Sequence, residues 1–116
     1  MGSRELITSL FEASSHIRYA ALFNREGAKL EGGMRSGLKP LEPESEAAEI
    51  DRQTVLYCAR LMSLERYLGK TEFVFARTMN VDVMAMPLSR DRILQVASQR
   101  LGELKLLDLV RNVLKA

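Results

Sequence analysis

A chain of 116 residues, 47% hydrophobic and 28% charged, is typical of one globular domain with a single core, and we expect one domain over residues 1–116. The formal net charge of +2 and the lack of Trp exclude a strongly basic, aromatic surface for nucleic acid. No apolar run approaches the roughly 18 residues of a membrane span, and no signal-peptide pattern opens the chain. We therefore predict a cytoplasmic protein without membrane insertion.

A short helix and a β-hairpin are the first predicted elements. Residues 4–13 repeat apolar side chains with a helical period, and Ser3 is the expected N-cap. Residues 17–35 alternate apolar and other side chains around a turn that contains Asn24 and Gly27, two residue types that tolerate positive φ. The first strand is apolar on both faces, which predicts an interior strand between helices, and the second is an expected outer strand.

A long helix is predicted from its N-cap, Ser45, to Leu68, with Gly69 in the left-handed position that ends it. Its wide apolar face is assigned to the sheet and consists of Ile50, Thr54, Tyr57, Cys58, Leu61, Met62, Leu64 and Leu68. Leu56 and Tyr67 fall on the opposite side, where a helix that covers only its own sheet would be polar. This surplus of apolar side chains predicts a partner surface.

Three strands and a last helix complete the chain. The strands are predicted at residues 72–78, 81–88 and 92–97, and the short turns between them favour an antiparallel meander. The helix begins at residues 102–103 and has an amphipathic pattern. The order α-β-β-α-β-β-β-α predicts an α/β (α+β) fold, with a central five-stranded antiparallel sheet and helices on both faces.

No group of residues has the pattern of a catalytic or metal site, and we predict no enzyme and no cofactor. His16 follows two serines, but without an oxyanion loop or a Gly-x-Ser-x-Gly turn it is expected to be an ordinary loop histidine. The acidic residues between Glu42 and Asp51 lack the EF-hand spacing and suit the start of the long helix. Cys58 lies on the apolar face of that helix and is an expected core residue.

The order of elements resembles the Roadblock fold, in the Roadblock, longin and profilin-like superfamily. The resemblance rests on the strand at residues 17–23 with its turn through Gly27, on the long helix that closes at Leu68 and Gly69, and on the meander before an amphipathic helix. Residues 17–20, 31–35 and 68–70 also resemble a family of small, functionally uncharacterised archaeal proteins.

The resemblance implies a homodimer in which the long helices pack antiparallel and the strand at residues 72–78 pairs with its counterpart. Roadblock-like proteins typically act as scaffolds or regulators of small GTPases or motors, and this chain has no P-loop motif of its own. The implied function is therefore a regulatory platform for a small GTPase. The predicted dimer interface comprises Arg52, Leu56, Arg60, Ser63, Tyr67, Phe73 and Phe75.

A profilin-like ligand sensor is the alternative function. Three methionines, Met79, Met84 and Met86, cluster in the meander, and soft side chains suit an adaptable binding surface. In this alternative a small molecule binds between the sheet and the long helix near Met84 and Met86. An ordinary core role remains the favoured interpretation of these residues.

Overall fold

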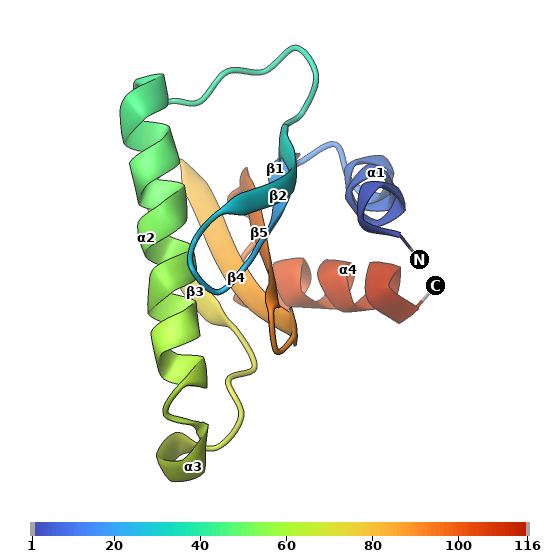
Figure 1. Ribbon diagram of the computed structural model, residues 1–116. Helices are drawn as coiled ribbons and strands as arrows, with labels where there is room; N and C mark the ends of the chain where they lie inside the picture. The colour runs from blue at the N-terminus through green and yellow to red at the C-terminus, as the bar shows by residue number, and fades with distance from the viewer. Residues whose placement is uncertain (1, 116) are drawn as a thin grey trace.

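The computed structural model describes residues 2–115. Its elements, in chain order, are α1 (Ser3–Ala13), β1 (Ile17–Phe23), β2 (Lys29–Met34), α2 (Glu44–Met62), α3 (Glu65–Leu68), β3 (Val74–Arg77), β4 (Val81–Ser89), β5 (Arg92–Gln99) and α4 (Glu103–Lys115). The five strands form one antiparallel sheet in the order β2-β1-β5-β4-β3. Figure 1 shows α2 on one face of the sheet and α1 and α4 on the other, as the order of elements predicts.

Two apolar layers hold the helices to the sheet. The layer beneath α1 and α4 includes Leu10, Ile17 and Leu106, and the layer beneath α2 includes Phe23 and Val55. Strand β1 contributes to both layers, because successive side chains of a strand point to opposite faces. The prediction that β1 is an interior strand buried on both faces is confirmed, and β2 is an edge strand as expected.

The predicted caps of the first two helices were wrong. Ser3 is the first helical residue of α1 and Gly2 occupies the N-cap position, while α2 begins at Glu44 after Pro43, one residue before Ser45. Neither N-cap residue forms a side-chain capping hydrogen bond. Gly and Pro have no side chain that can accept such a bond, so packing against the sheet is the main support of both helices.

The predicted single helix from residue 45 to residue 68 is broken, which corrects the sequence interpretation. The hydroxyl of Ser63 donates a hydrogen bond to the carbonyl of Arg60 at 2.6 Å. In a continuous helix that carbonyl accepts the N–H of Leu64, which here bonds to the carbonyl of Leu61 at 3.0 Å instead. The chain turns at residues 63–64 and resumes as α3, which ends at Gly69 with φ of 84° as expected.

A buried carboxylate ties the start of α4 to the sheet. Asp82 on β4 is fully buried, and its Oδ2 accepts the backbone N–H groups of Leu101 at 2.9 Å and Gly102 at 2.7 Å. Its Oδ1 forms an ion pair with Arg77 on β3 at 3.4 Å. One side chain therefore links β3, β4 and the entry to α4. Within residues 2–115, no helix has the length and apolar character needed to cross a membrane.

Candidate functional site

The side of α2 that meets the sheet differs from the predicted one. Val55, Cys58 and Ala59 are buried against the sheet, whereas Ile50 and Tyr57, assigned to the sheet from the sequence, are each 57% exposed. The largest apolar side chains of the segment, such as Tyr57, do not mark the buried side of α2. The close packing of α2 on the sheet instead selects a stripe of small and β-branched residues, so the predicted helix phase was wrong.

Leu56 and Arg52 contact the β-hairpin instead of projecting away from the molecule. A Cβ added to Gly27, in the turn between β1 and β2, would lie 3.0 Å from Cγ of Arg52 and 3.3 Å from Cγ of Leu56. This flank of α2 therefore lies over the β2 side of the sheet. Leu56 is half-buried within its own chain, so the expectation that it forms an outward apolar surplus was also wrong.

The opposite flank of α2 carries exposed apolar side chains. With 100° of rotation per residue, the exposed Ile50 and Tyr57 and the partly buried Leu61 lie far from Leu56 around the helix. They share the flank that faces away from the β1–β2 turn, toward the side where β3 forms the edge of the sheet. An apolar helix flank beside an unpaired strand edge is a candidate contact surface, because edge strands present free backbone N–H and C=O groups.

The remaining predicted interface residues are dispersed. Tyr67 on α3 is 75% exposed and the guanidinium of Arg66 lies 5.3 Å from its ring centre. Arg60 and Ser63 are exposed near the end of α2. Phe73, just before β3, and Phe75, on β3, are partly buried and pack on the core beneath α1 and α4. The structure thus places these two rings on the face of the sheet away from α2.

A second candidate site is a groove beneath the N-terminal half of α2, which we call the α2 groove. It has a volume of about 610 Å³ and is lined by residues of α2, of the loop before α2 and of all five strands or their ends, among them Tyr19, Leu38, Leu41, Ile50, Asp51 and Gln95. Small residues leave this space open, since Ala47 and Ala48 on the helix and Gly33 and Ala97 on the sheet line it. Sequence reasoning did not identify the groove.

Three polar side chains meet on the floor of the α2 groove. The Nε2 of Gln95 donates a hydrogen bond to Oδ1 of Asp51 at 2.9 Å. Burial raises the pKa of the Asp51 carboxyl, and nearby Glu42 raises it further. Burial, the charge of Asp51 and a hydrogen-bonding interaction with its carboxylate also raise the pKa of the Tyr19 phenol. That interaction falls outside ideal hydrogen-bond geometry, and Oε1 of Gln95 is buried without a hydrogen-bond partner among the described residues.

The location predicted for a small ligand was wrong. Met84 and Met86 are buried in the core beneath α1 and α4, on the face of the sheet opposite α2. Side chains along β4 point alternately to the two faces of the sheet, so Met84 and Met86 lie on one face while Val83 and Ala85 lie on the other, beneath α2. The space between sheet and helix exists, and Val83 rather than either methionine lines it.

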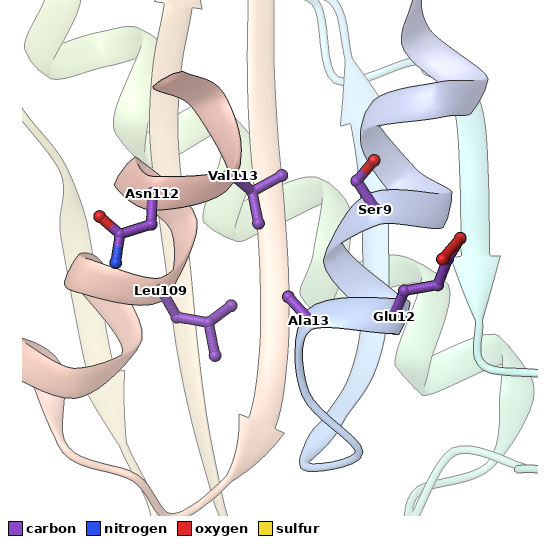
Figure 2. A pocket seen from close by; sticks show the side chains of 6 residues that line it. All are labelled: Ser9, Glu12, Ala13, Leu109, Asn112 and Val113. Atoms are coloured by element: carbon purple, nitrogen blue, oxygen red, sulfur yellow. The ribbon is translucent and has the colours of Figure 1, made fainter. Parts of the chain in front are cut away.

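A shallow furrow separates α1 and α4 on the other face of the molecule (Figure 2). It is lined by Ser9, Glu12, Ala13, Leu109, Asn112 and Val113. Figure 2 shows the polar ends of Glu12 and Asn112 pointing away from each other, and Leu109 and Ala13 nearer the gap. The furrow therefore lacks the converging polar groups that would fix the orientation of a ligand.

The nucleophilic and metal-binding candidates of the sequence have ordinary surroundings. The N–H of His16 donates to Oγ of Ser14 at 3.1 Å, and His16 Nδ1 lies 3.4 Å from the same oxygen, a local turn on an exposed loop. Cys58 is buried, and burial raises the pKa of its thiol to about 11. Over the described range 2–115, no three His, Cys, Asp or Glu side chains gather in a way that could hold a metal ion.

No protein-family model matches the chain, and no curated protein sequence matches it. Solved structures do. The gliding protein MglB of Thermus thermophilus is 14% identical, with a TM-score of 0.71 over 95% of this chain and 80% of that one. A structure of MglB with a tetrameric arrangement is 15% identical, with a TM-score of 0.71 over 95% and 79% of the two chains. A Roadblock/LC7 domain from Streptomyces avermitilis is 17% identical, with a TM-score of 0.66 over 94% and 92%.

Proposed function

We propose, from the Roadblock/LC7 fold that the chain shares with these structures, that residues 1–116 form one non-catalytic domain that pairs with a second copy of itself. In this proposal two β3 strands pair edge to edge, and the α2 helices of the two copies pack together above them. The dimer acts as a cytoplasmic interaction platform, and a small GTPase is the partner class that the Roadblock resemblance implies. The resemblance to an archaeal family stays a prediction.

The observation that carries the proposal is the pairing of two features on one side of the molecule. Ile50 and Tyr57 are exposed on the flank of α2 that faces away from the β1–β2 turn, and β3 is the edge strand on that side. Burying the exposed part of either side chain contributes roughly 1–2 kcal/mol. Edge pairing of β3 adds backbone hydrogen bonds in the same contact.

The short length of β3 and its anchoring on the core support a symmetric contact through this strand. It is only four residues long, and Phe75 anchors it on the core beneath α1 and α4 while Ala76 and Arg77 are exposed. The ion pair of Arg77 with buried Asp82 fixes its end. A short strand held firmly on one side presents its other edge without a large loss of conformational entropy on pairing.

The interface predicted from the sequence and the interface that the exposed apolar side chains favour lie on different flanks of α2. Tyr67 remains a candidate in both, whereas the rings of Phe73 and Phe75 pack on the core beneath α1 and α4 and only the backbone of this segment can take part. Arg52 and Ser63 lie around the helix toward the flank of Leu56, Ile50, Tyr57 and Leu61 lie on the other flank, and Arg60 lies between Leu56 and Tyr57. A glutamate at one position on each flank therefore separates the two possibilities.

Two variants, Tyr57→Glu and Arg52→Glu, test the proposal by size-exclusion chromatography with light scattering at micromolar concentration. Both positions are exposed, so neither substitution disturbs the core. We expect a dimer mass for the unsubstituted protein and for Arg52→Glu, and a monomer mass for Tyr57→Glu. A monomeric Arg52→Glu with a dimeric Tyr57→Glu would place the interface on the Leu56 flank. A monomer mass for the unsubstituted protein would contradict self-pairing.

A further inference from the structure

We propose that the α2 groove binds a small molecule with a primary ammonium head and an apolar tail, the head seated among Asp51, Gln95 and Tyr19. This inference rests on other observations than the pairing through β3, although Ile50 belongs both to the groove wall and to the proposed contact flank. It rests on the geometry of the groove floor, on the unpaired polar atoms there and on the apolar walls above it.

The sheet and the helix bring the three floor residues together. Ala21 lies opposite Gln95 in the pairing of β1 with β5, and Tyr19 lies opposite Ala97. Tyr19 and Gln95 are therefore diagonal neighbours on one face of the sheet, a separation that long side chains bridge. Asp51 reaches down from α2 to Gln95, 44 residues away in sequence, and its carboxylate closes the group from above.

The hydrogen bonding of this group is incomplete. Gln95 is 1% exposed and Tyr19 is 8% exposed, yet Gln95 Oε1 and the Tyr19 oxygen have no partner in ideal hydrogen-bond geometry among residues 2–115. Asp51 takes part in none of the ion pairs that the described residues form. Buried polar groups are normally satisfied, and those that are not call for a ligand, an ion or a water. The Asp51 carboxylate already receives the Gln95 amide nitrogen and interacts with the Tyr19 hydroxyl, so Gln95 Oε1 is the buried acceptor for which the floor offers no donor.

The polar atoms on the groove floor determine which chemical group the ligand's polar end must carry. A carboxylate is an acceptor only, and the amide nitrogen of Gln95 already donates to it, which leaves Oε1 as an acceptor. The Tyr19 hydroxyl keeps its proton, which can donate to Asp51, and its oxygen can accept a further bond. A primary ammonium has three N–H donors and one positive charge, so it can donate to Gln95 Oε1, to the Tyr19 oxygen and to a free lone pair of the Asp51 carboxylate. An anionic head would meet the charge of Asp51 at short range.

The walls and rim of the groove determine the chemistry of the ligand's tail. Leu38, Leu41 and Ile50 line the groove and are exposed, which provides an apolar surface for a tail. The volume of about 610 Å³ lies within the range of about 300–1,000 Å³ that small-molecule sites occupy. The charged rim is mixed, with Arg18, Lys29 and Lys39 against Glu42 and Glu44. Selectivity for the head therefore comes from the floor rather than from the rim.

The electrostatics of Asp51 agree with this geometry. Burial and the neighbouring Glu42 raise the pKa of its carboxyl, while hydrogen bonding with Tyr19 and Gln95 and the charge of Lys29 oppose the rise. An ammonium beside the carboxylate would favour its ionised form and offset the cost of burial. The ionised carboxylate is the state in which it binds the ammonium, so affinity should fall as the pH is lowered through the pKa of Asp51.

Calorimetric titration with n-hexylamine at neutral pH tests the proposal, with hexanoate and n-hexanol as matched probes of the same tail. We expect saturable binding of the amine, at least tenfold weaker binding of the alcohol and none of the carboxylate. In Asp51→Asn, which keeps the size of the side chain and an acceptor for Gln95, the affinity for the amine should fall at least tenfold. Glu46→Gln, an exposed carboxylate in the first turn of α2, should bind as the unsubstituted protein does.

Several results would overturn the inference. Equal binding of hexanoate and hexylamine would show a groove without selectivity for the head, and an unchanged affinity in folded Asp51→Asn would show that the carboxylate has no part in binding. Absence of saturable heat with hexylamine would contradict the site itself. Binding that appears only in Tyr57→Glu, the variant expected to be monomeric, would show that a second copy of the chain fills the groove. Circular dichroism confirms that each variant is folded.

Discussion

Replacing Asp82 by Ala removes the carboxylate that connects β3, β4 and the start of α4. Two backbone N–H groups, those of Leu101 and Gly102, lose the acceptor that lies 2.9 Å and 2.7 Å away, and Arg77 loses its ion pair. Hydrogen bonds to a charged group contribute about 1.5–3 kcal/mol each. Water reaches the partly buried N–H groups and Arg77 is half-exposed. We therefore expect the free energy of unfolding to fall by about 2–4 kcal/mol.

Urea unfolding followed by circular dichroism measures this loss. Asp82→Asn keeps an acceptor oxygen and should cost less than Asp82→Ala, because only the charge and the ion pair with Arg77 are lost. Asp108→Ala, at an exposed position of α4, is the matched control and should stay within about 0.5 kcal/mol of the unsubstituted protein. A loss below about 1 kcal/mol for Asp82→Ala would refute the anchoring role of the carboxylate, since even one charged hydrogen bond contributes more.

Three further predictions concern α2 and its surroundings. The folded-state pKa of Asp51 is raised, so the protonated carboxyl stabilises the fold at a pH below the unfolded value of 3.8, and this stabilisation is lost as the pH rises through the folded-state pKa. Asp51→Asn should therefore unfold at a higher urea concentration than the unsubstituted protein at pH 7. The difference between the two midpoints should vanish as the pH is lowered toward 3.8. Gly27→Ala should lower stability by about 1–2 kcal/mol in the same assay, because φ is 85° and Arg52 lies 3.0 Å from the new Cβ. The Cys58 thiol should react with a disulfide reagent at pH 8 only on unfolding, since it is buried and its pKa is about 11. Equal urea midpoints in the first two cases, or fast thiol labelling of the native protein in the third, would contradict these expectations.

The architecture could be predicted because its signals are local. The residues of β1 alternate between two buried faces, and this pattern alone indicated an interior strand with helices on both sides. The break after α2 was not predicted, because Ser63 is compatible with a helix and its bond to the Arg60 carbonyl, which accompanies the break, is a side-chain contact. Side-chain competition of this kind leaves no periodic signal in the sequence.

The candidate sites depend on how α2 packs on the sheet and on contacts between residues far apart in the chain, which the sequence pattern indicates only indirectly. Side-chain size misled the phase of α2, because Val55 and Ala59 meet the sheet while Tyr57 does not, although Cys58 is buried as expected. The floor of the α2 groove joins residues 44 positions apart, a distance over which no spacing rule applies. One signal was available: Gln95 is a polar residue inside the apolar run of β5, and a buried amide requires partners.

Hydrogen exchange of the β3 backbone at several protein concentrations tests the central proposal most directly. Edge pairing of two β3 strands would protect the outward N–H groups of Val74–Arg77 only in the dimer. We predict slow exchange of this segment at concentrations where light scattering gives a dimer mass, and fast exchange in the Tyr57→Glu variant. Exchange of β3 that stays equally fast in a protein with a dimer mass would contradict pairing through this edge.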